Sequence, residues 1–246
     1  MNSGFNKDAD SLCDGDMKKS PLISLEQVSK SFVEGGVRHQ VLNSVSAEFL
    51  EGECVALLGR SGSGKSTLLN LISGIDKPDS GKINIGGIDI TDLSERERTL
   101  FRRKNIGFIY QFFNLIPTLT VLENVLLPLE LNGKNRRDAA LELLDEVSLL
   151  NRKSDYPDRL SGGEQQRVAI IRALVHDPLI ILADEPTGNI DRETGRHILD
   201  IMERLIRRRN KNLILVTHSQ EVTMLADRLL LLEEGIFKKH SREIIW

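Results

Sequence analysis

The sequence predicts an α/β fold with a parallel sheet at its centre. Four short apolar runs, CVALL, NIGFIY, LIILA and NLILV, lack the alternation of half-exposed strands, which is typical of parallel strands covered on both faces. Between them lie apolar residues at helical spacing: Leu68, Leu69, Leu71 and Ile72; Ala140, Leu143, Leu144 and Val147; and Ile198, Ile201, Met202 and Leu205. We therefore expect a sheet whose strands alternate with helices along the chain.

The first part of the chain is expected to form an antiparallel β subdomain. ISLEQVSKSF and NSVSAEF are predicted strands, the second with alternating apolar residues, and INIGGIDI is a predicted hairpin with its turn at Gly86-Gly87. The segment from about 115 to 175 is mostly helical and interrupts the series of parallel strands. We interpret it as a helical subdomain inserted into the α/β domain.

Length and composition favour a globular protein, and we expect a single domain over residues 21–246. A chain of 246 residues with 40% apolar and 28% charged residues can bury one large core or two modest ones. Residues 1–20, MNSGFNKDADSLCDGDMKKS, contain too few apolar groups to offset the entropy of ordering, so we expect a disordered tail. No run approaches the ~20 apolar residues of a membrane span, and the N-terminus lacks the apolar core of a signal peptide.

Charge and cysteine content argue against a nucleic-acid partner and a disulfide framework. The net charge of −3 is small, and the basic run Arg207-Arg208-Arg209 is most simply the last turn of a helix, so no nucleic-acid partner is expected. Cys13 and Cys54 are too few for a disulfide framework or a metal cluster. A reducing cytosol fits this composition.

The most specific motif is GRSGSGKST, which follows the run CVALL and precedes a predicted amphipathic helix. It matches the pattern G-x-x-x-x-G-K-[ST], in which glycines let successive N–H groups face one anion and the helix N-terminus adds partial positive charge. Lys65 is expected to reach the β- and γ-phosphates, and Ser66 to ligate Mg²⁺. The predicted fold class is therefore a P-loop NTPase, with candidate nucleotide-binding residues Gly59, Arg60, Ser61, Gly62, Ser63, Gly64, Lys65, Ser66 and Thr67.

Polar residues follow each of the four apolar runs. CVALL leads into Gly59, NIGFIY into Gln111, LIILA into Asp184-Glu185, and NLILVT into His218. Ligands collect at the carboxyl ends of the strands in an open parallel sheet, so we expect these residues to converge at one edge.

Each of these polar residues suits a step in nucleotide hydrolysis. We expect Asp184 to bind Mg²⁺, and Glu185, pointing in another direction from an extended chain, to act as general base for the attacking water. His218 could contact the γ-phosphate, and Gln111 could bind metal or water and report the nucleotide state. A lone His or Gln at a strand end is more often structural, so the hypothesis rests on their convergence.

The segment LSGGEQQRVAIIRAL, residues 160–174, resembles the signature sequence of ABC-transporter ATPases, which otherwise has Gln in the place of Glu164. The resemblance extends from about residue 22 to residue 235, with every motif in family order, and it implies an ATPase that uses ATP and Mg²⁺. The same segment also fits a capping box, with Ser161 at the N-cap and Glu164 three residues later. Both interpretations can hold.

The resemblance further implies a head-to-tail homodimer of ATPase subunits. In the family the signature of one copy closes over the ATP of the other, which assigns Ser161, Gly162, Gly163 and Glu164 to the partner's nucleotide. Asp191 matches the D-loop aspartate, which works across the dimer interface in the family.

Two further positions follow from the resemblance. Phe32 stands where the family usually carries an aromatic residue, commonly Tyr, that stacks on adenine, and a core Phe is an equally good interpretation. The residues from Asn114 to Val125 would contact the coupling helix of a membrane subunit, or their apolar members could simply be core.

The segments QFFNLIPTLTVLENV and ADEPTGNID resemble the branch that includes lipoprotein-releasing, macrolide-exporting and cell-division ATPases. This implies transmembrane permease subunits as partners and a peripheral location on the cytoplasmic side of the inner (plasma) membrane. A soluble ABC ATPase of translation or DNA repair is the alternative, but such proteins usually carry tandem ATPase domains or a long coiled coil, and neither is present here. A binding module that uses ATP only to switch is disfavoured by the presence of Glu185.

Overall fold

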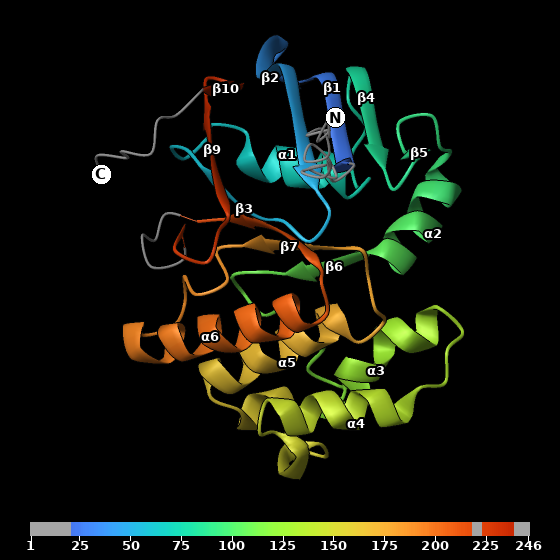
Figure 1. Cartoon of the computed structure of the whole chain (residues 1–246), viewed down its shortest axis with the longest axis vertical. Coiled ribbons are helices and arrows are strands. Elements are labelled where there is room, and N and C mark those ends of the chain that lie inside the picture. Colours follow the sequence, from blue (N-terminus) through green and yellow to red (C-terminus); the bar gives the residue numbers. More distant parts are fainter. Residues whose placement is uncertain (1–20, 218–222, 239–246) are drawn as a thin grey trace, which may run out of the picture.

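Two β-sheets and two groups of helices make up the fold, seen in a computed structural model that describes residues 21–217 and 223–238 (Figure 1). The strands are β1 (Pro21–Glu34), β2 (Val37–Leu50), β3 (Cys54–Leu58), β4 (Ser80–Ile85), β5 (Ile88–Asp89), β6 (Ile106–Ile109), β7 (Ile180–Asp184), β8 (Asn212–Val216), β9 (Arg228–Glu233) and β10 (Ile236–Lys238). The helices are α1 (Lys65–Ile72), α2 (Glu95–Asn105), α3 (Val121–Leu131), α4 (Arg137–Glu146), α5 (Gly162–Leu174) and α6 (Arg192–Arg208), with the 3₁₀ helices η1 (Leu150–Arg152) and η2 (Pro157–Arg159). The tail of residues 1–20 lies outside the described residues.

The larger sheet has the strand order β10-β9-β3-β8-β7-β6. Strands β9, β3, β8, β7 and β6 are parallel to their neighbours, and β10 is antiparallel to β9 at the edge. The four apolar runs form β3, β6, β7 and β8, which confirms the predicted parallel core. Strands β9 and β10, whose residues are mostly half-buried, were not predicted.

The core strands are buried on both faces, which explains why their sequences do not alternate. In β7, Ile180 and Leu182 pack into the cluster that contains α1 and the antiparallel sheet, whereas Ile181 and Ala183 pack into the cluster formed with α3, α4, α5 and α6. Figure 1 shows the same layers, with α1 on one side of the sheet and these four helices on the other. The parallel sheet is thus the middle layer of the molecule.

The smaller sheet, in the order β2-β1-β4-β5, is antiparallel throughout, as predicted. Its β4–β5 turn is the expected Gly86-Gly87 pair, with φ angles of 58° and 82° that glycine adopts without steric cost. Strands β1 and β2 are joined by a second glycine pair, Gly35-Gly36. This long hairpin brings β1 and β2 alongside the phosphate-binding loop described below.

The chain between β6 and β7 contains α3, α4, both 3₁₀ helices and α5, which confirms the predicted helical insertion. Helix α2 was not predicted, because Phe101 is its one buried residue and no apolar stripe marks it. The pair Ser94 and Glu97, a capping box at its start, is the signal that could have indicated it. Among the helices of residues 21–217 and 223–238, none is long and apolar enough to span a bilayer.

Candidate nucleotide site

The loop between β3 and α1 forms a phosphate-binding cradle. Gly62 and Gly64 adopt φ angles of 78° and 101°, which residues with side chains rarely permit. At Gly64 a Cβ atom would also lie 2.9 Å from Leu42 Cδ2 and 3.0 Å from the Val41 carbonyl oxygen, so β2 leaves no room for a side chain. Helix α1 begins after this glycine with no side-chain cap, and its first N–H groups therefore remain available to an anion.

Lys65 is the first residue of α1 and is buried, with 7% of its surface exposed. Its Nζ donates hydrogen bonds to the carbonyl oxygens of Gly59 and Arg60, at 2.8 and 2.9 Å. Burial lowers the pKa of Lys65, and the nearby carboxylates of Glu185 and Asp184 act in the opposite direction. The ammonium group is thereby held inside the loop and lines the adjoining cavity.

That cavity, of about 470 Å³, lies at the carboxyl edge of the parallel sheet. Its lining comes from β1, β2, the phosphate-binding loop and the ends of β6, β7 and β8: Phe32, Val41, Ser61, Gly62, Gly64, Lys65, Ser66, Thr67, Gln111, Asp184, Glu185 and Val216. A larger groove of about 910 Å³ crosses the antiparallel sheet, but no phosphate-binding loop lines it. The 470 Å³ cavity is therefore the candidate nucleotide site, where the strand ends meet.

Ser66 and Asp184 place oxygen ligands side by side in the cavity. Ser66 Oγ donates a hydrogen bond to Asp184 Oδ2 at 3.3 Å, and Gln111 lines the same space. Hydroxyl, carboxylate and amide oxygens are the ligands that Mg²⁺ prefers, so this donor set fits the ion. Within the described residues no group of three or more His, Cys, Asp or Glu side chains could hold a metal, so the fit is to Mg²⁺ that keeps water and phosphate ligands.

Glu185 lies beyond the end of β7, in the left-handed conformation with a φ of 47°. The expectation that it alternates with Asp184 along an extended strand is wrong, because β7 ends at Asp184. A turn changes its direction instead: Glu185 N–H donates to the Val216 carbonyl, and Gly188 N–H donates to the Glu185 carbonyl, both at 3.0 Å. A non-glycine residue in this conformation carries about 1–3 kcal/mol of strain, which is common at functional sites.

Gln111 is tied to the segment that follows Glu185. Gln111 Nε2 donates to Asn189 Oδ1 at 3.4 Å, and Asn189 Nδ2 donates to the Gln111 carbonyl at 3.0 Å. A Cβ atom on Gly188 would lie 2.9 Å from Gln111 Nε2, so the two segments are in close contact. Asn189 and Val41 were not predicted as site residues: Asn189 stands within the segment ADEPTGNID, which was the available signal, whereas Val41 belongs to no motif.

Eight of the predicted site residues that the structure describes do not line the cavity, and four of these eight belong to the signature described below. Arg60 and Ser63 line a neighbouring cavity of about 370 Å³, and Gly59 contributes its carbonyl oxygen to the Lys65 ammonium. Asp191 is the N-cap of α6, where its carboxylate accepts a hydrogen bond from a backbone N–H of that helix. His218 lies outside the described residues, so its contact with the γ-phosphate stays a prediction.

The signature residues also lie away from the cavity lining, at the N-terminus of α5. Ser161 Oγ accepts a hydrogen bond from Glu164 N–H at 3.3 Å, and Glu164 Oε2 accepts one from Ser161 N–H at 2.8 Å, which forms the capping box. Gly163 packs against α6, where a Cβ atom would lie 2.5 Å from Thr194 Cγ2. Ser161 and Gly162 are exposed, so the signature presents an open surface to solvent.

The fold and the site together define a P-loop ATPase. A parallel sheet delivers a glycine-rich loop, a buried lysine and two carboxylates to one cavity, and a helical segment is inserted between β6 and β7. The chain belongs to the ABC transporter family, whose model matches residues 42–188. It is therefore an ATP-binding and ATP-hydrolysing cassette of that family.

Relatives and solved structures agree with this assignment. An uncharacterized ABC transporter ATP-binding protein of Mycobacterium tuberculosis (strain ATCC 25618 / H37Rv) is 55% identical over 222 residues, covering 89% of this chain and 90% of the relative. The lipoprotein-releasing system ATP-binding protein LolD of Coxiella burnetii (strain RSA 493 / Nine Mile phase I) is 44% identical over 229 residues, covering 92% and 98%. The dimeric ATP-binding cassette MJ0796, bound to ADP and Pi after hydrolysis, matches with a TM-score of 0.81 at 41% identity, covering 88% of this chain and 97% of that one.

Proposed function

We propose that two copies of this chain form a head-to-tail dimer that hydrolyses ATP to drive the permease subunits of a transporter of the lipoprotein-releasing or macrolide-exporting kind. The main support for this proposal is that the two halves of the site lie apart within one chain. The cavity is lined by the phosphate-binding loop, Asp184 and Glu185, whereas the signature is exposed at the N-terminus of α5. A second copy would supply the missing half. Similarity to a dimeric cassette and to a lipoprotein-releasing ATPase supports this proposal.

Within one half-site we propose a division of labour among four residues. Ser66, Asp184 and Gln111 would hold Mg²⁺, which supplies charge neutralisation on the phosphates when bound. Lys65 would bind the β- and γ-phosphates in exchange for its loop carbonyls.

The remaining roles concern the attacking water, the γ-phosphate and the adenine ring. Glu185 would accept a proton from the water, since it lines the same cavity as the phosphate cradle. His218 is proposed on sequence grounds to contact the γ-phosphate. Phe32 would stack on adenine, since its ring lines the cavity and is 41% exposed, which argues against the core interpretation.

Residues at the exposed half-site would act on the ATP of the other copy. Ser161, Gly162 and Gly163 open α5, where backbone N–H groups can face a phosphate, and Glu164 sits in the same turn. Asp191 would work at the same interface from the start of α6.

A groove of about 360 Å³ beside β6, α3 and α5 is the proposed docking site for the permease. Its lining combines apolar side chains such as Ile116 and Leu127 with three arginines, Arg102, Arg103 and Arg172. Charge complementarity therefore favours a cytoplasmic segment of the permease with apolar residues and at least one acidic residue. Such docking would place the chain peripherally on the cytoplasmic side of the inner membrane.

Each of the two interpretations of the segment from Asn114 to Val125 has support in a different part of it. Asn114 and Ile116 line the groove, whereas Val121, Leu122 and Val125 are buried in the core below the sheet. The first part of the segment thus fits a docking surface and the second part fits the core.

A pull-down from native membranes tests the proposal. Tagged Glu185→Gln protein, loaded with ATP in mild detergent, should co-purify with a polytopic permease, because a chain that binds ATP without hydrolysing it stays in the closed dimer. Recovery of only soluble or ribosomal partners would overturn the transporter function in favour of a soluble ABC ATPase of translation or DNA repair. The same pull-down with Arg103→Glu in the groove should lose the permease.

A further inference from the structure

The tip of the β1–β2 hairpin carries Phe32 into the nucleotide cavity without an anchor in the hydrophobic core. No residue of β1 after Val28 is buried, and no residue of β2 before Leu42 is buried. A ring that is 41% exposed on such a tip has freedom to change rotamer. Some other contact must therefore define where the ring lies.

Lys30 supplies that contact. Lys30 and Phe32 are two residues apart on β1, so their side chains share a face, and Lys30 Nζ lies 5.2 Å from the centre of the Phe32 ring. The Lys30 side chain is 11% exposed, so the ammonium is largely shielded from water. A cation at this distance from an aromatic face is attracted to it, more strongly where water is excluded.

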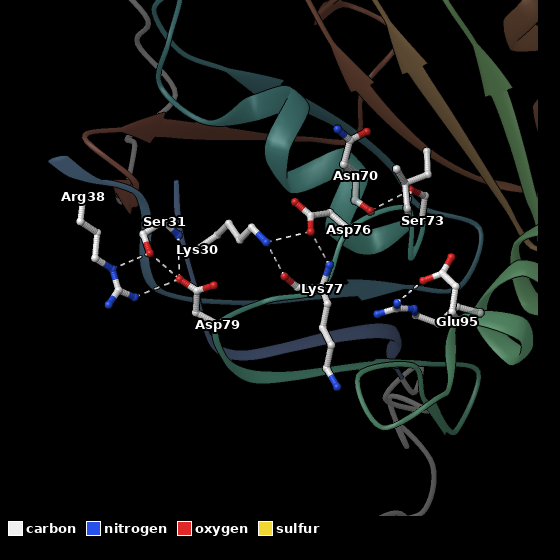
Figure 2. Close-up of polar contacts among 11 residues, drawn as sticks. Lys30, Ser31, Arg38, Asn70, Ser73, Asp76, Lys77, Asp79 and Glu95 are labelled. Atoms are coloured by element: carbon white, nitrogen blue, oxygen red, sulfur yellow. Dashed lines mark hydrogen bonds and ion pairs between the residues drawn. The ribbon is translucent and has the colours of Figure 1, made fainter. Parts of the chain in front are cut away.

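The ammonium of Lys30 is in turn held by the loop that follows α1. Its Nζ donates to Asp76 Oδ1 and to the Lys77 carbonyl oxygen, both at 2.7 Å (Figure 2). The ammonium thus makes two hydrogen bonds to this loop and a cation–π contact with the Phe32 ring. Helix α1 starts at Lys65 in the phosphate cradle, so Lys30 links the far end of the P-loop helix to the base side of the cavity.

A second set of contacts fixes the same hairpin from the opposite face of β1. Asp79 Oδ2 accepts from Ser31 N–H at 2.9 Å and from Arg38 Nη2 at 3.2 Å, and Arg38 Nε donates to Ser31 Oγ at 2.7 Å (Figure 2). These hydrogen bonds connect both strands of the hairpin to the loop before β4. The tip is therefore held on two sides by polar contacts, and Lys30 is the one that reaches the ring.

We infer that Lys30, oriented by Asp76, is a positioning residue that holds the Phe32 ring in place for stacking on the nucleotide base. The inference rests on the proposed role of Phe32 and adds to it the residues that orient the ring. Stacking reads no base edge, so Lys30 acts alike on ATP and GTP. Since the phosphates bind at the other end of the cavity, Lys30 affects the base and leaves phosphate binding unchanged.

The test compares a ligand that has a base with one that has none. Equilibrium binding to the full chain is measured for Mg·ATP and for Mg·tripolyphosphate, in wild type, Lys30→Gln and Asp76→Asn. We expect Lys30→Gln to weaken ATP binding about 3- to 10-fold and to leave tripolyphosphate binding unchanged. Asp76→Asn should act in the same direction with a smaller effect, and it keeps the test open should Lys30→Gln fold poorly. KM for ATP should rise while kcat stays the same.

A double-mutant cycle and a matched control complete the design. In a Phe32→Ala background, Lys30→Gln should weaken ATP binding no further, because the ring on which it acts is gone. Lys82→Gln removes an exposed lysine whose Nζ lies 3.8 Å from Asp89 on the same sheet, and it should bind both ligands like wild type. Equal losses for ATP and tripolyphosphate, additive losses in the cycle, or no loss at all would overturn the inference. Wild-type protein that binds neither ligand would instead overturn the proposed function.

Discussion

Two helix N-termini in this molecule have opposite designs. Helix α1 starts after Gly64, a residue with positive φ and no side chain, and no side chain of residues 21–217 and 223–238 caps it. Helix α5 starts after Ser161 and is closed by a capping box in which Ser161 and Glu164 each satisfy the other's backbone N–H. Both ends carry the same partial positive charge, but α1 leaves its N–H groups open whereas α5 already has a carboxylate beside it.

The difference indicates what each end is built for. An uncapped helix N-terminus gives up about 1 kcal/mol of local stability, and a bound phosphate can supply the missing partner. A capped N-terminus is stable without a ligand and suits a surface that must persist in solution before its partner arrives. We therefore expect α1 to define ATP affinity within one chain and α5 to act after two chains meet.

The largest expected effect comes from Glu185→Gln, which separates binding from hydrolysis. Removing a general base costs about 10²- to 10⁴-fold in rate, so turnover of ATP should fall by that factor while binding persists. With ATP the variant should elute as a dimer, and without ATP as a monomer, measured by size-exclusion chromatography with light scattering. Hydrolysis at the wild-type rate would show that Glu185 is not the base.

Lys65→Ala tests the proposal that the N-terminus of α1 binds the phosphates of ATP. Charge-assisted hydrogen bonds to phosphate oxygens are lost, so ATP affinity should fall about 10- to 100-fold by calorimetry. Lys104→Ala, which removes an exposed lysine from the last turn of α2, is the control and should bind ATP normally. Unchanged affinity in Lys65→Ala would contradict the phosphate-cradle assignment.

Ser161→Ala tests whether Ser161 takes part in ATP hydrolysis in addition to capping α5. Loss of an N-cap serine costs about 1 kcal/mol of stability, and Ser94→Ala at the equivalent position of α2 should cost the same. Chemical denaturation measures both. Only Ser161→Ala should also slow ATP hydrolysis, because only α5 is proposed to meet ATP; equal hydrolysis by the two variants would reduce the signature serine to a helix cap.

Much of the fold and the phosphate side of the site could be predicted from the sequence. Strands buried on both faces give apolar runs, and a phosphate-binding loop gives a fixed spacing of glycines before Lys65, so both leave local patterns. Helix α2 left little trace because it buries Phe101 alone. Strand β9 does contain an apolar run, LLLL, and was overlooked, whereas the three residues of β10 are too few to show a pattern.

The contacts that orient the site were harder to predict. Lys30 and Asp76 lie 46 positions apart, and each is one charged residue among many, so the ion pair appears only once β1 and the loop after α1 are in place. Glu185 was assigned to the cavity by the sequence, but its left-handed conformation depends on a hydrogen bond to Val216 from another strand. Sequence motifs thus identify which residues take part in the chemistry, and tertiary contacts determine how their side chains are oriented.

Glu164→Gln is expected to have the smallest effect on stability, and it is the most direct test of the difference between the N-termini of α1 and α5. Hydrogen bonds from the Ser161 backbone N–H and hydroxyl hold the pKa of Glu164 below its usual value, so its contribution to stability is present above pH 4.5 and is lost as the pH falls through the lowered pKa. Gln keeps the shape of the box without the charge at the helix N-terminus. At neutral pH the variant should melt about 1–2 °C lower than wild type, and the difference should shrink below pH 4.5.

The same variant should improve assembly while it lowers stability. If the γ-phosphate of a partner's ATP approaches the start of α5, the carboxylate of Glu164 repels it, so Glu164→Gln should strengthen ATP-dependent dimerisation of the Glu185→Gln protein a few-fold. Glu97→Gln, which changes the matching carboxylate in the capping box of α2, should leave dimerisation unchanged. Equal dimerisation constants for the two variants would mean that no phosphate comes near α5, and the exposed signature would then need another partner.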